Sequence, residues 1–183
     1  MRTAAAAPAR DRLGGSDCER LRPGLVAQPV NTVTSLGYVL AGGIVLATAR
    51  GRGELPARAA MAYSGLLGLV GLGSVAFHGP QPPGARLMHD APIPVLLLAA
   101  VATPTARVRR GVPALPGWSR RRGGVLVGLS AAAAAAYLGG RTDAHTCDPD
   151  SMVQLHGAWH LLSAATFVVL ARALFEEEVR SHG

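Results

Sequence analysis

The chain has 183 residues, which is the length of one domain. Hydrophobic residues make up 49% of it and the mean hydropathy is +0.27, while the charged residues gather between long apolar stretches. This composition is typical of a multi-span membrane protein and excludes a soluble globular one. The formal charge is +7, and all 18 basic residues are arginines. Because they stand in loops between apolar segments, they indicate membrane topology, and we expect no nucleic-acid binding.

Residues 1–28 are expected to form an extramembrane lead-in. Charged residues interrupt its alanine run, so no apolar core of signal-peptide length follows the first arginines. We therefore predict that residues 1–22 are disordered or loosely ordered. A transmembrane hydrolase-like domain is expected over residues 29–175, followed by a cytoplasmic tail over residues 176–183.

Five apolar segments are long enough, or nearly so, to cross a bilayer as helices, which takes about 20 residues each. They run over about 30–49, 59–77, 87–106, 124–138 and 152–174. The segment between the third and fourth spans is too charged and too rich in proline to cross. The predicted fold class is therefore all-α, a polytopic transmembrane helical bundle of about five spans.

Small residues and prolines indicate how these spans begin and pack. Asn31 or Thr32 is placed to cap the first helix. Four small residues in the second span would let a neighbouring helix approach closely: Gly65, Gly68, Gly71 and Gly73. Three prolines predict kinks in the third span: Pro92, Pro94 and Pro104.

The distribution of arginine predicts the orientation of the bundle. The loop after the first span carries Arg50, Arg52 and Arg58, and the loop after the third carries six more arginines within residues 107–122. The alternate loops carry only Arg86 and Arg141. By the positive-inside rule, we expect the N-terminus outside and the C-terminus in the cytoplasm, in a bacterial plasma membrane.

Three histidines are expected to meet at the outer face. His156 and His160 are four residues apart, so their rings project from one face of the fifth helix, a spacing by which paired histidines bind zinc. His78 ends the second span at the same outer level and supplies a third ligand. Ionisable groups at such depth are costly, which makes them candidates for a functional site. Three neutral imidazoles make a zinc site with one position open to water.

Two further residues are predicted to assist catalysis there. Asp90 begins the third span, where a carboxylate can accept a proton from the attacking water. Ser74 shares a helix face with His78 and can hydrogen-bond the oxyanion or orient Asp90. The plainer interpretations are a helix cap for Asp90 and helix packing for Ser74. His89, one residue from Asp90, is expected to be an interfacial histidine and not a ligand.

The two cysteines, Cys18 and Cys147, are both expected on the outer side of the membrane. An oxidising exterior permits a disulfide between them, and two unpaired thiols are the alternative.

The motifs together resemble the alkaline ceramidases and their wider CREST superfamily of membrane hydrolases. The resemblance rests on residues 71–78 (GLGSVAFH), on Asp90 and on residues 156–160 (HGAWH). Residues 17–19 (DCE) and 31–33 (NTV) are similar to the opening of that family.

The resemblance implies zinc held by His78, His156 and His160, with Asp90 and Ser74 assisting the attack of water on an amide. The implied substrate is a lipid amide such as ceramide. The family has seven spans where this chain shows five, and the difference bears on the lipid pocket more than on the chemistry. The family also has an acidic calcium site, but Gln28 stands here where it has Glu, and we expect no calcium near Asp17 and Glu19.

Two other classes of function remain open. In a haem-binding electron-transfer protein, His78 and either His156 or His160 would be the axial ligands, which leaves Ser74 and Asp90 without roles. In a receptor or scaffold, zinc would be structural and no turnover would occur. A serine intramembrane protease is disfavoured because Ser74 and His78 lie on one helix. The oligomeric state is left undetermined.

Overall fold

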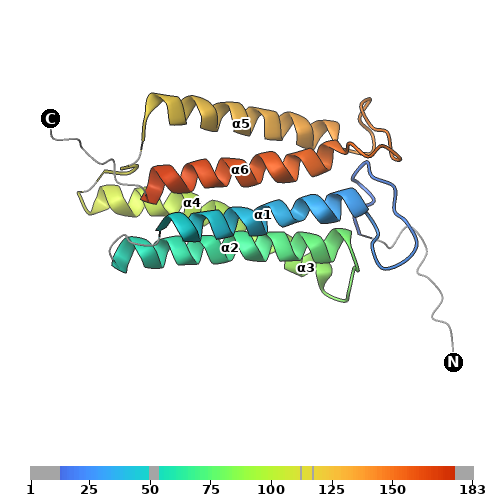
Figure 1. Cartoon of the computed structure of the whole chain (residues 1–183), viewed down its shortest axis with the longest axis horizontal. Coiled ribbons are helices and arrows are strands. Elements are labelled where there is room, and N and C mark those ends of the chain that lie inside the picture. Colours follow the sequence, from blue (N-terminus) through green and yellow to red (C-terminus); the bar gives the residue numbers. More distant parts are fainter. Residues whose placement is uncertain (1–12, 50–53, 112, 117, 176–183) are drawn as a thin grey trace.

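The computed structural model describes residues 13–49, 54–111, 113–116 and 118–175, and within these ranges the chain is helical (Figure 1). The helices are α1 (Pro29–Ala49), α2 (Glu54–His78), α3 (Ala85–Asp90), α4 (Pro92–Arg109), α5 (Arg120–Gly139) and α6 (Leu155–Phe175). Five segments are long and apolar enough to cross a membrane: Pro29–Thr48, Arg58–His78, Ala85–Arg109, Arg120–Gly139 and Leu155–Phe175. The predicted all-α bundle with five spans is confirmed, and it indicates an integral membrane protein.

The third span is divided into two helices, α3 and α4. The division falls at Ala91, directly before Pro92 at the start of α4. Proline has no N–H to donate and fits the first turn of a helix, so it ends α3 and begins α4. Pro104 lies inside α4. Ala91 keeps helical dihedral angles, and its amide donates to the Leu87 carbonyl at 3.0 Å, so the interruption before Pro92 is local and α4 follows directly on α3.

Helix α1 lies between α2 and α6, and α5 packs on the side of α6 that faces away from α1 (Figure 1). Among the described helices, α5 contacts α6 alone. The core between α1, α2 and α6 contains Tyr38, Tyr63, Leu67 and Leu174, all buried. Many other large apolar side chains remain on the outside of the bundle, where lipid tails are as apolar as they are.

Close helix approach is confirmed at two of the four glycines in α2. A Cβ on Gly71 would lie 2.7 Å from Cγ2 of Val39 on α1, and a Cβ on Gly73 would overlap the Met88 carbonyl of α3. Gly65 and Gly68 face open space, so the expectation is wrong for them. Gly73 therefore lets α3 dock directly on α2.

The segment before α1 is ordered where the structure describes it. Cys18 and Cys147 form a disulfide with Cα atoms 5.4 Å apart, so the thiols are paired. The amide of Cys18 donates to the Gly140 carbonyl at 2.8 Å, and Asp17 and Arg141 pair through their backbones as an isolated antiparallel β-bridge. The prediction of a loosely ordered lead-in is wrong for residues 13–22, because these bonds fasten the segment to the loop between α5 and α6. Residues 1–12 lie outside the described ranges, as do Arg50, Arg52 and the predicted tail over 176–183.

The cap of α1 comes from a residue ten positions before the helix. The two carboxylate oxygens of Glu19 accept hydrogen bonds from the amides of Val30 and Asn31, both at 2.8 Å. A negative charge at this end also complements the helix dipole. Asn31 and Thr32 lie within the helix, and Thr32 donates its hydroxyl to the Gln28 carbonyl. The predicted capping residues are therefore replaced by Glu19.

The candidate site residues belong to elements that meet at one end of the bundle. The start of α1, the end of α2, helix α3 and the start of α6 lie together there (Figure 1). The segment between α4 and α5, with its arginines, lies at the opposite end (Figure 1).

Candidate metal centre

Three histidines meet at that end of the bundle. His78 is the last residue of α2, and His156 and His160 lie in the first two turns of α6. One ring nitrogen from each lies within 4.8 Å of the others, and the side chains are 0%, 4% and 0% exposed. The three ring centroids are 4.8–5.2 Å apart. The convergence that the helical spacing predicted is confirmed, and we call these residues the histidine cluster.

The proton on His78 can be located from its neighbour Gln28. The Gln28 amide nitrogen donates to the carbonyls of Gly14 and Glu19, at 3.0 and 2.8 Å. Its oxygen is therefore the atom 2.7 Å from His78 Nδ1, and an amide oxygen can only accept. His78 thus carries its proton on Nδ1, which leaves a lone pair on Nε2.

The same reasoning applies to His160. Its Nδ1 lies 3.2 Å from the Thr34 hydroxyl and 3.4 Å from the Ser35 hydroxyl. Both hydroxyls donate to backbone carbonyls of α1, those of Val30 and Asn31. Because their protons are engaged, the hydroxyl oxygens accept from Nδ1–H, and Nε2 of His160 is also left with a lone pair.

A buried carboxylate, that of Asp17, lies near the third ring, although neither nitrogen of His156 has a hydrogen-bond partner. Asp17 Oδ1 lies 3.4 Å from His156 Nδ1, and Oδ2 lies 3.9 Å from His78 Nδ1. Burial raises the pKa of the Asp17 carboxyl to about 6, an effect that nearby Arg141 and a hydrogen bond from Ser16 oppose. The Arg141 guanidinium approaches Oδ1 at 3.5 Å. Ligand histidines commonly present their second nitrogen to such a carboxylate or carbonyl.

The Nε2 atoms of all three histidines are buried and have no hydrogen-bond partner. Leaving three polar nitrogens unpartnered in an apolar interior is costly. A metal ion among them would satisfy all three. Three neutral imidazoles with an open fourth position are a typical donor set of catalytic zinc, so the residues present fit that ion.

Ser74 lies where the sequence predicted it. It is 2% exposed on α2, one turn before His78 and on the same helix face.

Asp90 and His89 are arranged differently from the expectation. The Asp90 side chain is 56% exposed, and its carboxylate accepts a hydrogen bond from His89 Nδ1 at 2.7 Å. The His89 side chain is only 14% exposed and stacks on Phe77, with ring centroids 4.3 Å apart. Its ring also meets His78 edge-on at 5.9 Å. The structure thus places His89 beside the histidine cluster, with Asp90 bonded to its outer side.

Sequence reasoning gave no site role to Gln28, Thr34 or Ser35. A signal for the last two was present, because polar side chains recur in the apolar first span at the spacing of one helix face: Asn31, Thr34, Ser35 and Tyr38. Gln28 precedes the helix, and its role depends on a contact with a residue 50 positions away.

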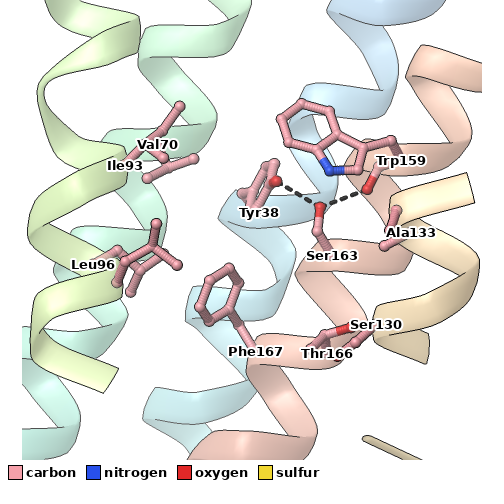
Figure 2. Close-up of a pocket in the computed structure, with 12 residues that line it drawn as sticks. Tyr38, Val70, Ile93, Leu96, Ser130, Ala133, Trp159, Ser163, Thr166 and Phe167 are labelled. Atoms are coloured by element: carbon pink, nitrogen blue, oxygen red, sulfur yellow. Dashed lines mark hydrogen bonds between the residues drawn. The ribbon is translucent and has the colours of Figure 1, made fainter. Parts of the chain in front are cut away.

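An apolar cavity of about 310 Å³ is lined by residues of α1, α2, α4, α5 and α6 (Figure 2). Figure 2 shows Val70, Ile93 and Leu96 on one side of it and Tyr38 and Trp159 on the other. Trp159 directly precedes His160, and the rings of Tyr38 and His160 are 6.2 Å apart. The Tyr38 hydroxyl is also bonded to Ser163, at 2.6 Å. The cavity therefore shares a wall with the candidate metal centre.

Comparison of the chain with protein-family models, with curated proteins and with solved structures finds no match.

Proposed function

We propose that this chain is a zinc-dependent integral membrane hydrolase that cleaves an amide bond in a ceramide-like lipid. One observation carries the proposal: three buried imidazoles each bring a ring nitrogen within 4.8 Å of the others. Their Nε2 atoms have no hydrogen-bond partner, while the Nδ1 atoms of His78 and His160 are held by protein acceptors. This arrangement suits three nitrogen ligands on one ion and leaves a position for chemistry.

Zinc, when bound there, lowers the pKa of a coordinated water toward neutrality and polarises a carbonyl oxygen. His78, His156 and His160 would hold it. Ser74 would donate a hydrogen bond to the oxygen on which negative charge develops. Asp90 would assist from the α3 side, and its carboxylate reaches the site through His89.

The neighbouring cavity supports an apolar substrate. Nine of its twelve lining residues are aliphatic or aromatic, and one of these, Trp159, contacts His160 of the histidine cluster. It is bordered by α4 and α5, which do not contact each other. An acyl chain could enter between them from the bilayer, with its amide group reaching the metal centre.

We further propose that the site faces the outside of a bacterial plasma membrane. The disulfide between Cys18 and Cys147 lies at the same end of the bundle as the histidine cluster, and disulfides persist in oxidising compartments. The arginines of residues 107–122 lie at the other end, as expected for a cytoplasmic loop.

Metal analysis of detergent-purified protein tests the proposal first. We expect about one zinc per chain in the wild type and loss of zinc in His156→Ala. His145→Ala is the matched control, because His145 is an exposed histidine in the loop before α6. A haem absorbance band in the wild type, or zinc retained by His156→Ala, would contradict the zinc site.

Hydrolysis of a fluorescent N-acyl sphingosine then separates an enzyme from a scaffold with structural zinc. The enzyme should release fatty acid in proportion to its zinc content. A zinc-loaded protein that releases none from short- or long-chain substrates would favour the scaffold.

A further inference from the structure

The environment of His89 differs from that of an interfacial histidine. Its Nε2 is buried and has no hydrogen-bond partner, although the ring lies near the end of the bundle. Phe77 stacks on one face of the ring, and His78 lies perpendicular to it with centroids 5.9 Å apart. A polar nitrogen held in such a place needs a ligand that the protein itself does not supply.

The orientation of the ring is determined from its other side. Asp90, an acceptor when ionised, takes the hydrogen bond from His89 Nδ1 at 2.7 Å. The proton is therefore on Nδ1, and the lone pair is on the buried Nε2. A histidine oriented by a carboxylate, with its free nitrogen in a reaction site, is the arrangement of a general base.

The packing of α3 on α2 accounts for the burial of the His89 ring, which is 14% exposed, while the Asp90 carboxylate is 56% exposed. A Cβ on Gly73 would overlap the Met88 carbonyl and lie 3.1 Å from Cα of His89. Helix α3 thus rests directly on α2 at Gly73, the residue before Ser74 and five residues before His78. This close contact between α3 and the α2 backbone holds the His89 end of α3 in place against α2.

From this geometry we propose that His89 is the catalytic residue that hydrogen-bonds the attacking water through Nε2, and that Asp90 is the positioning residue that orients it. The inference rests on the proposed function. As the water oxygen bonds to the amide carbon, its proton passes to His89 Nε2. The same proton then goes to the amine nitrogen as the C–N bond breaks, which yields a fatty acid and a free amine.

The test uses the full chain in detergent, loaded with zinc or with cobalt(II), which accepts the same nitrogen ligands and reports its coordination in visible absorbance. The variants are His89→Ala, His89→Gln, Asp90→Asn and Asp90→Glu. Leu87→Ala is the control, because this α3 side chain is 71% exposed and lies outside the site.

We expect the two His89 variants to keep about one metal per chain and to lose roughly 100-fold or more in kcat. Their cobalt spectra should shift, because the group beside the open position is gone. Asp90→Asn should lower kcat about tenfold with KM unchanged, and Asp90→Glu should recover part of it. Leu87→Ala should match the wild type in every measurement.

Three results would overturn the proposal. Loss of metal in both His89 variants would make His89 a ligand. An unchanged cobalt spectrum together with unchanged kcat would place His89 outside the reaction site. A greater loss of kcat in Asp90→Asn than in His89→Ala would make Asp90 the catalytic group.

Failure of the proposed function would look different. A wild type that binds cobalt and hydrolyses no lipid amide would count against the proposed function. A spectral shift in His89→Ala and His89→Gln would still support the placement of His89.

Discussion

Gln28 and His78 are joined by a hydrogen bond of 2.7 Å whose direction follows from the other bonds of the glutamine amide. The Gln28 nitrogen is engaged by two backbone carbonyls, so its oxygen faces the imidazole. Gln28 is itself fully buried between the N-terminal segment and the end of α2. It therefore couples the order of that segment to the protonation pattern of His78.

Replacement of Gln28 should weaken metal binding in a way that depends on the substituent. Gln28→Leu removes the acceptor from His78 Nδ1, and we expect zinc affinity to fall about 10- to 100-fold. Gln28→Glu keeps an acceptor oxygen, so affinity should stay near that of the wild type. The new glutamate cannot donate hydrogen bonds to the carbonyls of Gly14 and Glu19. The melting temperature of the Gln28→Glu protein should therefore fall below that of the wild type. Competition with a chromophoric chelator measures the affinity, and equal losses in the two variants would refute the role of the acceptor.

Gly73 should be sensitive to substitution where Gly68 is not. Gly73→Ala forces α3 away from α2, and overpacking of this kind costs about 1–3 kcal/mol. The variant should unfold at a lower temperature and lose hydrolytic activity, because His89 moves with α3. Gly68→Ala is the matched control on the same helix and should melt at or above the wild-type temperature. Indistinguishable melting of the two variants would show that α3 does not rest on Gly73.

The disulfide should contribute strongly to stability. It joins residues 129 positions apart, and loss of a native disulfide typically costs about 2–5 kcal/mol. We expect the double variant Cys18→Ser, Cys147→Ser to melt earlier and to bind zinc more weakly, because Asp17 and Gln28 belong to the segment that the bridge fastens. Alkylation with a polyethylene-glycol maleimide should shift the wild type on a gel only after reduction. A shift without reductant would mean that the thiols are free.

Membrane orientation can be measured with single cysteines added to the wild type, whose bridged pair does not react with maleimides. His145→Cys lies in the loop before α6 and Arg109→Cys at the end of α4, and both native side chains are exposed. In intact spheroplasts an impermeant maleimide should label position 145. Position 109 should be labelled only after lysis. The reverse pattern would place the histidine cluster in the cytoplasm.

Helix number and the histidine cluster could be predicted because they depend on local order along the chain. The length of each apolar run determines whether it crosses a bilayer, and the five runs match the five spans of the structure. A separation of four residues places His156 and His160 on one helix face in any surroundings. His78 joined them because helices crossing in opposite directions bring the end of α2 and the start of α6 to the same level.

The N-terminal segment could not be predicted in the same way. Its residues are polar and show no helical or strand periodicity, a pattern typical of loosely ordered chain. Its order comes from the disulfide, from backbone bonds to the loop before α6 and from Glu19 at the start of α1. These contacts join residues that are far apart in the sequence, or that only a turn of the backbone brings together. A pattern within a few neighbouring residues therefore cannot predict them.

The all-helical membrane fold could be predicted from the chain alone, because a segment that crosses a bilayer must be a long apolar helix with its backbone groups bonded internally. The meeting of His78, His156 and His160 could be predicted as well. The relative burial of His89 and Asp90 could not, because it depends on how helices pack. These residues are adjacent on a helix of six residues, and the contact of α3 with Gly73 decides which side chain faces inward. That rotation depends on packing between helices, a contact that neither helix specifies alone.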